Sequence, residues 1–204
     1  MQRPDTKPEA GRSGKTFVLV SGLPRSGTSL MMQLIEAGGI PVMTDKQRGA
    51  DVDNPRGYYE WEAIKQIAKR PDLLDDNVNG CAIKCISALL PALPPRHHYK
   101  VIFMLRPIAE VIASQRVMLA RLGTGGASLD PGHLERGLRA HREEIRAWAA
   151  TKPYVQWLEI SYPELVRDPA PAIMKLVEFL GKEYLLNEQA MAAVIDPTLH
   201  RHRT

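Results

Sequence analysis

The feature of the sequence that most constrains its fold is a short apolar run that ends in a glycine turn and continues into a helix. The run TFVLVSG, residues 16–22, is rich in β-branched side chains and predicts a buried strand. The turn LPRSGTS follows, and SLMMQLIEAGG then has helical spacing and ends at paired glycines. Such a turn points several backbone N–H groups at one spot, where the helix dipole adds positive potential. The segment therefore predicts an anion-binding site, with Arg25 and the hydroxyls of Ser26, Thr28 and Ser29 as further donors.

The turn also resembles the phosphate-binding pattern GxxxxGK[ST], but one residue of that pattern is missing. Gly22, Gly27 and Ser29 occupy the two glycine positions and the final hydroxyl position. Thr28 stands where the pattern has the lysine that serves the β- and γ-phosphates of a nucleoside triphosphate. The loop therefore predicts binding of a phosphate or sulfate group and argues against hydrolysis of ATP or GTP.

The rest of the chain alternates short apolar runs with helical segments. Strands are predicted at 39–43, 80–86, 98–106 and 154–160, and helices at 60–68, 107–122, 134–150 and 169–181. Strands that alternate with helices indicate a parallel sheet with helices on both faces. We therefore predict an α/β fold of the three-layer P-loop type, a single domain over residues 16–204 that follows a disordered segment at 1–15. A long polar loop at 44–57 and a linker at 124–132 interrupt the pattern.

Two motifs together resemble a known family, the sulfotransferases that use 3′-phosphoadenosine 5′-phosphosulfate (PAPS). GLPRSGTSLM is similar to the loop that binds the 5′-phosphosulfate, above all in tyrosylprotein and bacterial members. VIFMLRPIAEVIAS resembles the 3′-phosphate site, where Arg106 and Ser114 occupy the positions of the family's arginine and serine. Arg106 would emerge at the carboxyl end of a strand, where ligands bind in open α/β sheets. A third stretch, from Trp157 to Gly181, resembles the family's late strand and last helix, and we interpret it as scaffold.

The resemblance implies an activity and a donor: transfer of the sulfonate group of PAPS to a hydroxyl or amine acceptor, without a metal. Arg25 is expected to neutralise the leaving phosphate and the moving sulfonate, with hydrogen bonds from Thr28 and Ser29. Cytosolic aryl and steroid members carry a Lys-Thr/Ser-His run that contains the catalytic histidine. Here Lys84 is kept, but Ile86 stands at the histidine position, and a hydrocarbon cannot accept a proton. The sequence therefore argues against the phenol and steroid branch.

Other branches of the family use a carboxylate that follows the first helix, and two residues fit that place. Asp45 lies nearer the position of the base in tyrosylprotein sulfotransferases, although it could instead cap a turn. Glu60 lies in a GYYE setting that resembles bacterial members, where neighbouring aromatic residues could exclude water, although it could be a solvated first-turn residue. We favour Glu60 as the general base and keep Asp45 as the alternative.

Two other functions remain open from the sequence. The chain could be a nucleotide or small-molecule kinase of related fold, or a non-catalytic module that binds the desulfonated product of PAPS and has lost its base. The formal net charge of +4 fits an anionic ligand but is too small to indicate a nucleic-acid partner. A small molecule, a carbohydrate or a peptide could be the acceptor, and the oligomeric state is not predicted.

The remaining signals concern the surroundings of the protein. Apolar runs are too short to span a bilayer, and the first residues lack the apolar stretch of a secretory signal, so we expect a cytoplasmic protein. Cys81 and Cys85 are expected to be buried reduced thiols. His97 and His98 are expected to be surface loop residues at the wrong end of the sheet for catalysis, and the basic tail at 201–203 a solvated end.

Overall fold

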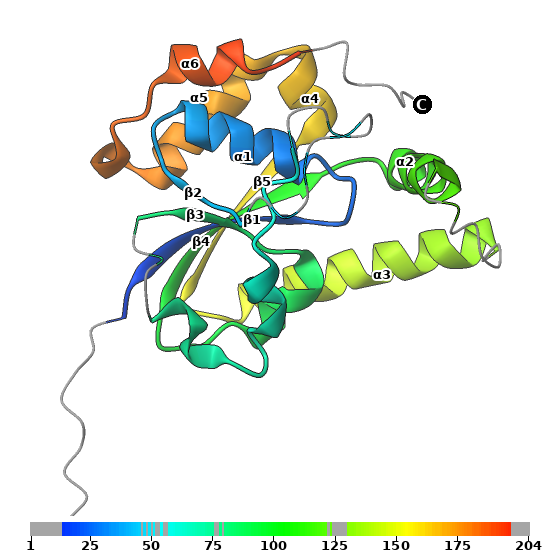
Figure 1. The fold of residues 1–204 in the computed structure, drawn as a ribbon, viewed down its shortest axis with the longest axis horizontal. Coiled ribbons are helices and arrows are strands. Elements are labelled where there is room, and N and C mark those ends of the chain that lie inside the picture. The colour runs from blue at the N-terminus through cyan, green and yellow to red at the C-terminus, as the bar shows by residue number, and fades with distance from the viewer. Residues whose placement is uncertain are drawn as a thin grey trace, which may run out of the picture.

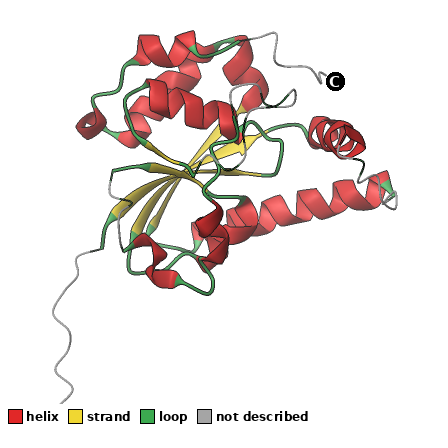
Figure 2. Ribbon diagram, in the orientation of Figure 1, coloured by secondary structure: helices red, strands yellow, loops and turns green. Residues whose placement is uncertain are grey.

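The computed structural model describes residues 14–45, 47, 49, 51, 54, 57–75, 78, 80–121, 123 and 130–196. At its centre, five parallel strands pair in the order β2-β3-β1-β4-β5, with helices on both faces (Figures 1 and 2). The strands are β1 (Thr16–Gly22), β2 (Val42–Met43), β3 (Ala82–Lys84), β4 (His98–Leu105) and β5 (Val155–Ser161). The α/β fold with a parallel sheet between helices, predicted from the alternation of strands and helices, is confirmed.

The helices form one layer above the sheet in Figure 1 and another below it. The α-helices are α1 (Thr28–Ala37), α2 (Ile108–Arg121), α3 (Pro131–Ala150), α4 (Tyr162–Arg167), α5 (Pro169–Leu180) and α6 (Glu188–Ala193). Short 3₁₀ helices are η1 (Glu62–Gln66), η2 (Pro71–Leu74), η3 (Ser87–Ala92) and η4 (Lys182–Tyr184). Among the described residues, no helix is long and apolar enough to cross a membrane.

The central strand β1 is buried on both faces. Its side chains point alternately to the two faces of the sheet, so they contribute to two separate hydrophobic clusters. Val18 and Val20 pack into a cluster with residues of α1, α4, α5 and α6, on the upper side in Figure 1. Phe17 and Leu19 point the other way, into a cluster with residues of the 3₁₀ segments and Ile145 of α3. This double burial explains why β1 and β4 are nearly continuous apolar runs in the sequence, as strands of a parallel sheet are.

The sheet order places the two phosphate motifs side by side. β1 pairs directly with β4, and Gly22 at the end of β1 is in register with Met104 near the end of β4. The loop after β1 and the residues after β4 therefore leave the sheet at the same edge. This is the carboxyl edge, where ligands bind in open α/β sheets. Figure 1 shows α2, which follows β4, to the right of the sheet and above α3.

Several expectations about local structure were wrong. The helix expected at 60–68 is the short 3₁₀ helix η1, and α4 and α6 were not predicted at all.

The two cysteines are both free thiols, but only Cys85 is buried as expected, and Cys81 is half-buried. Burial raises the pKa of the Cys85 thiol to about 12. The segment at 1–13, the tail at 201–203, half of the predicted 44–57 loop and residues 124–129 of the predicted linker lie outside the described residues.

His97 is also not the surface residue expected, because it is 5% exposed. The Lys15 backbone N–H donates to its Nδ1 at 3.3 Å, so in the neutral ring Nε2 carries the hydrogen that Asp75 Oδ1 accepts at 3.0 Å. A partner for each ring nitrogen is what lets a histidine be buried here. The residue does lie just before β4, at the amino-terminal edge of the sheet.

Candidate functional site

The loop between β1 and α1 has the backbone shape of an anion-binding turn. Arg25 and Gly27 both have positive φ, 70° and 100°, which turns the chain sharply before α1 begins at Thr28. Gly22 must be a glycine for packing as well, since a Cβ there would lie 2.4 Å from Ser26 Oγ. The Ser26 hydroxyl is buried and has no hydrogen-bond partner among the described residues. A buried hydroxyl without a partner, inside a glycine turn at a helix start, fits an anionic ligand.

The same loop is attached to α2, on which the second motif lies. Arg25 Nε donates to Ser114 Oγ at 2.9 Å, across 89 residues of sequence. Arg106 Nη1 donates to the backbone carbonyl of Arg25 at 3.1 Å, and Gln115 Nε2 donates to the carbonyl of Pro24 at 3.4 Å. The structure therefore joins the two motifs through side chains as well as through strand pairing.

Arg106 leaves the sheet immediately after β4 and has a largely buried side chain. Its Nε donates to Glu110 Oε2 at 2.8 Å, with 7% and 4% of the two side chains exposed. Its guanidinium carbon lies 4.7 Å from the centre of the Tyr162 ring, a cation–π distance. The same ring packs against the first loop, because a Cβ on Gly27 would lie 2.3 Å from Tyr162 Cδ2. Tyr162 therefore supports the loop and Arg106 together.

Lys84, at the end of β3, connects the first loop with the segment that carries Glu60. Its Nζ donates to Ser29 Oγ at 3.1 Å and to the backbone carbonyl of Tyr58 at 2.7 Å. Glu60 Oε1 lies 3.9 Å from the same nitrogen, and the lysine and glutamate side chains are 9% and 25% exposed. Glu60 is thus a partly accessible carboxylate, and it has the Lys84 ammonium as a neighbour in common with the Ser29 hydroxyl at the start of α1.

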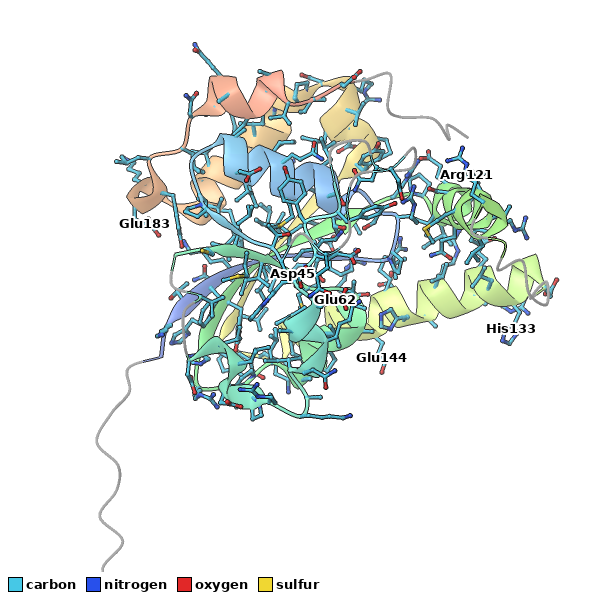
Figure 3. All side chains as sticks on the ribbon, viewed as in Figure 1. Asp45, Glu62, Arg121, His133, Glu144 and Glu183 are labelled. Carbon is cyan, nitrogen blue, oxygen red and sulfur yellow. The ribbon has the colours of Figure 1, made fainter. Side chains whose placement is uncertain are left out.

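Asp45 lies close to the Glu60–Glu62 segment in the folded structure, but its carboxylate has a different role from that proposed for Glu60. It accepts the backbone N–H of Glu62 at 2.7 Å and that of Gln47 at 3.1 Å. Asp45 and Glu62 are both labelled in Figure 3. These two hydrogen bonds to the backbone lower the pKa of Asp45. Its own backbone N–H donates to the carbonyl of Glu60 at 3.2 Å. Asp45 therefore stabilises the turn that presents Glu60.

The aromatic residues next to Glu60 are fixed by carboxylates. The buried Tyr58 donates its hydroxyl to both oxygens of Asp51, at 2.9 and 2.8 Å. Tyr59 has φ 55°, which is unusual for a bulky residue, and donates its hydroxyl to Glu36 Oε2 of α1 at 2.8 Å. A residue in this region costs about 1–3 kcal/mol and persists where its surroundings over-determine it. The backbone on the amino side of Glu60 is therefore held in one strained conformation.

Sequence reasoning missed the contributions of three residues to this site. Lys84 was noted as kept but given no contact, Glu110 was not considered, and Tyr162 was interpreted as scaffold. Glu110 could have been found, because it follows Arg106 by one helical turn, the spacing of an ion pair on a helix. Tyr162 could not have been found from the sequence, since its contacts with Gly27 and Arg106 depend on how three strands are ordered in the sheet.

Among the described residues, no cluster of three or more metal-ligating side chains is present.

One family model and several solved structures are similar to this chain. Residues 81–185, about half of the chain, match the family model described as the Sulfotransferase family. The sulfotransferase domain from the curacin biosynthetic pathway has a similar fold, with a TM-score of 0.51 and 16% identity over 91% of this chain and 89% of that domain. The sulfotransferase domain of the Synechococcus PCC 7002 olefin synthase aligns with a TM-score of 0.49 and 17% identity, over 100% of this chain and 86% of that domain. No curated protein matches the sequence significantly.

Proposed function

We propose that this chain, which belongs to the sulfotransferase family, transfers the sulfonate group of PAPS to a hydroxyl or amine acceptor. The observation that carries the proposal is the junction of the two phosphate motifs, in which Arg25 of the first loop bonds to Ser114 of α2. A donor with phosphate groups at both the 5′ and the 3′ position needs two anion sites, separated by the ribose that carries both groups. A nucleoside triphosphate carries its three phosphates in one chain on the 5′ oxygen, so it has no phosphate group to bind at the second site.

The residues present fit such a donor. At the first loop, the 5′-phosphosulfate would be held by the hydroxyls of Ser26, Thr28 and Ser29 and by the backbone at Gly27. The Ser26 hydroxyl is available for this, since it has no hydrogen-bond partner in the part of the chain that the structure describes. At the second motif, Arg106 and Ser114 would hold the 3′-phosphate. PAPS, when bound, supplies the sulfonate group and a phosphate as leaving group.

The chain's own part in the reaction is to orient the donor, neutralise charge and accept a proton. Backbone N–H groups and cations at the loop stabilise the charge that develops on the leaving phosphate. Glu60 is the proposed base that accepts the proton of the acceptor hydroxyl or amine. The Lys84 ammonium supports this role, because it lies 3.9 Å from Glu60 and donates to Ser29 of the donor loop. The exposed side chain of Ile86 follows Lys84, 39% accessible, and would border the acceptor rather than take part in proton transfer.

The test is binding of adenosine 3′,5′-bisphosphate (PAP), the product left after transfer, measured by calorimetry against ATP with Mg²⁺. We expect tight binding of PAP, weak binding of ATP, and a loss of at least about tenfold in PAP affinity in Ser114→Ala, since a hydrogen bond to a charged group is lost. Ser114→Ala is preferable to Arg106→Ala, which would leave the buried Glu110 carboxylate without its cation. Preference for ATP with Mg²⁺ and indifference to the Ser114 change would contradict the proposal and favour a kinase.

A matched assay tests catalysis itself. PAPS-dependent sulfonation of a panel of small-molecule, carbohydrate and peptide acceptors should proceed in the presence of EDTA, because the proposed site uses no metal. Binding of PAP without transfer to any acceptor would favour a non-catalytic module instead.

A further inference from the structure

Helix α3 carries a histidine on the face that packs against the rest of the protein. Leu134 and Leu138 pack against the cluster that contains Leu23 of the first loop, and Ile145 is buried in the cluster below the sheet (Figure 1). His141 lies between Leu138 and Ile145, at the spacings that keep side chains on one face of a helix. A polar side chain on an apolar face is costly unless it has a partner. The imidazole is therefore held between the first loop and the lower core.

One ring nitrogen of His141 is bonded to the segment that follows β3. Its Nε2 lies 2.9 Å from Ser87 Oγ, a contact between residues 54 apart in the sequence. Ser87 is buried and begins η3, directly after the exposed Ile86. Because β3 is a parallel neighbour of β1, this segment leaves the sheet at the same edge as the first loop. His141 thus reaches, from a helix below the sheet, the edge at which the donor is proposed to bind.

The other ring nitrogen of His141 remains able to bind a ligand. Nδ1 has no hydrogen-bond partner in the part of the chain that the structure describes, and the residue is half-buried rather than enclosed. A neutral imidazole has one donor and one acceptor nitrogen, so Nδ1 takes the role that Nε2 does not take toward Ser87. A hydroxyl group can both donate and accept, so it suits Nδ1 in either case.

The end of β3 connects this imidazole with the proposed base. Lys84, the last residue of β3, lies 3.9 Å from Glu60. Lys84 and Ser87 are three residues apart, so their Cα atoms are separated by at most about 10 Å. The exposed side chain of Ile86 comes between them in the chain. An acceptor that passes over Ile86 would therefore present one end to Glu60 and the other to His141.

We propose that His141 binds the acceptor, through a hydrogen bond between Nδ1 and a polar group other than the one that receives the sulfonate. Ser87 fixes the orientation of the ring, and Ile86 contacts the apolar part of the acceptor between its two polar groups. The site thus selects acceptors with two polar groups, such as a diol, over acceptors with one. This assignment rests on the proposed function and deepens it by naming the class of acceptor.

The experiment compares two acceptors that differ in one hydroxyl group, the primary alcohol octanol and octanediol with a hydroxyl at each end. Both are assayed for sulfonation with PAPS as donor. The wild-type KM for octanediol should be about threefold to tenfold lower than that for octanol, beyond the statistical advantage of two reactive ends. This is the size of one hydrogen bond, and kcat should change far less than KM.

Two variants of His141 separate acceptor binding from a structural role. In His141→Gln the amide can occupy the Nε2 position and keep the bond to Ser87, but nothing polar remains at the Nδ1 position. In His141→Asn the shorter amide keeps a polar group at the Nδ1 position but does not reach Ser87. The preference for octanediol should be lost in the Gln variant and kept in the Asn variant. A purely structural contact predicts the reverse, with the Gln variant resembling the wild type.

Ser87→Ala tests the positioning role, because it removes the hydroxyl and leaves His141 in place. It should raise the KM for octanediol without a matching change in kcat or in the affinity for PAP. His133→Gln, at an exposed position of α3 that is labelled in Figure 3, is the matched control and should keep the wild-type preference. Unfolding in urea should show that all of these variants are folded.

The inference is wrong if His141→Gln keeps the wild-type preference for octanediol, because the contact with Ser87 would then be only structural. It is also wrong if the wild-type protein binds PAP but does not prefer octanediol, or sulfonates neither alcohol. Failure of the proposed function itself gives a different result, since the wild-type protein would then not bind PAP, and the inference would fail with it.

Discussion

Glu60 and Asp45 are carboxylates on two neighbouring turns, and their surroundings give them different chemistry. Both oxygens of Asp45 accept backbone N–H groups, which holds its pKa below the usual range and makes it a poor proton acceptor. Glu60 is one quarter exposed and has the Lys84 ammonium 3.9 Å away. At the scale of single residues, the geometry favours Glu60 as the base and Asp45 as the residue that fixes its turn.

Replacement of Glu60 by Gln should therefore leave donor binding intact and remove most of the turnover. Loss of a general base typically slows the chemical step by about a hundredfold to ten-thousandfold. The measurement is kcat with PAPS and an accepted acceptor, alongside the calorimetric affinity for PAP. Asp45→Asn is the matched control: the single amide oxygen can still accept one of the two backbone N–H groups, that of Glu62, and its kcat should fall far less. Full activity in Glu60→Gln would remove Glu60 from the mechanism.

His97 should make the stability of the protein depend on pH. Burial lowers the pKa of His97 below its ordinary value of 6.5, so the unfolded chain binds its proton more readily than the folded one. The stability contributed by neutral His97 is fully present above pH 6.5 and is lost as the pH falls below that value.

The measurement is the free energy of unfolding in urea between pH 8 and pH 5 for the wild type and for His97→Gln. We expect the wild type to lose more stability across this range than the variant, which cannot bind the proton. His98→Gln, at an exposed position next to it, should keep the wild-type slope. Equal slopes in all three proteins would show that His97 does not titrate in this way.

At the scale of elements, the junction between β4 and α2 depends on one buried ion pair. Arg106 lies just before α2 and Glu110 lies in the first turn of α2, and Tyr162 from the start of α4 covers the guanidinium. Removing one partner of a buried pair leaves an uncompensated charge, whereas replacing both with apolar residues can be nearly neutral. The pair is thus important for local structure as well as for the proposed phosphate contact.

Arg106→Ala alone should destabilise the fold by about 3–5 kcal/mol. The double change Arg106→Met with Glu110→Leu should recover most of that stability but not PAP binding. Chemical denaturation gives the free energies, and calorimetry gives the affinities. Recovery of binding in the double variant would show that Arg106 has only a structural role.

At the scale of the whole molecule, the sheet order β2-β3-β1-β4-β5 assembles the site. β1 is central, so the loop that follows it has β3 with Lys84 on one side and β4 with Arg106 on the other. β1 is distant in sequence from β3 and β4, and the three strands together bring a loop and two cations to one edge.

Because a donor bound at this edge would touch elements throughout the sheet, binding should stabilise the entire domain as one unit. PAP at a hundred times its Kd should raise the free energy of unfolding by about 2.7 kcal/mol. For a chain of this length, that corresponds to a rise in Tm of about 5–11 °C. The measurement is thermal unfolding by circular dichroism and by tryptophan fluorescence, with AMP at the same concentration as the control. A shift seen by one probe and not the other would contradict a single cooperative domain.

Much of the fold could be predicted from the sequence. The bounds of β1 agree with the expectation to the residue, and those of β4, α2 and α5 agree within a residue or two. These elements are specified by the periodicity of their apolar residues and by Gly22 and Pro107 at their ends. All of these are local signals that can be recognised within a few residues of sequence. The short α4 and α6 were missed because six residues carry too little periodicity to stand out from a loop.

The candidate site was predictable in its residue types but not in its connections. Local signals alone placed Gly27, Thr28 and Ser29 in an anion-binding turn, since a glycine turn and a helix start are determined within a few residues. The bond from Arg25 to Ser114 spans 89 residues, and the contacts of Lys84 and Tyr162 likewise join distant segments. Only the tertiary structure decides these, because they require both a strand order and a side-chain direction, and neither follows from local spacing.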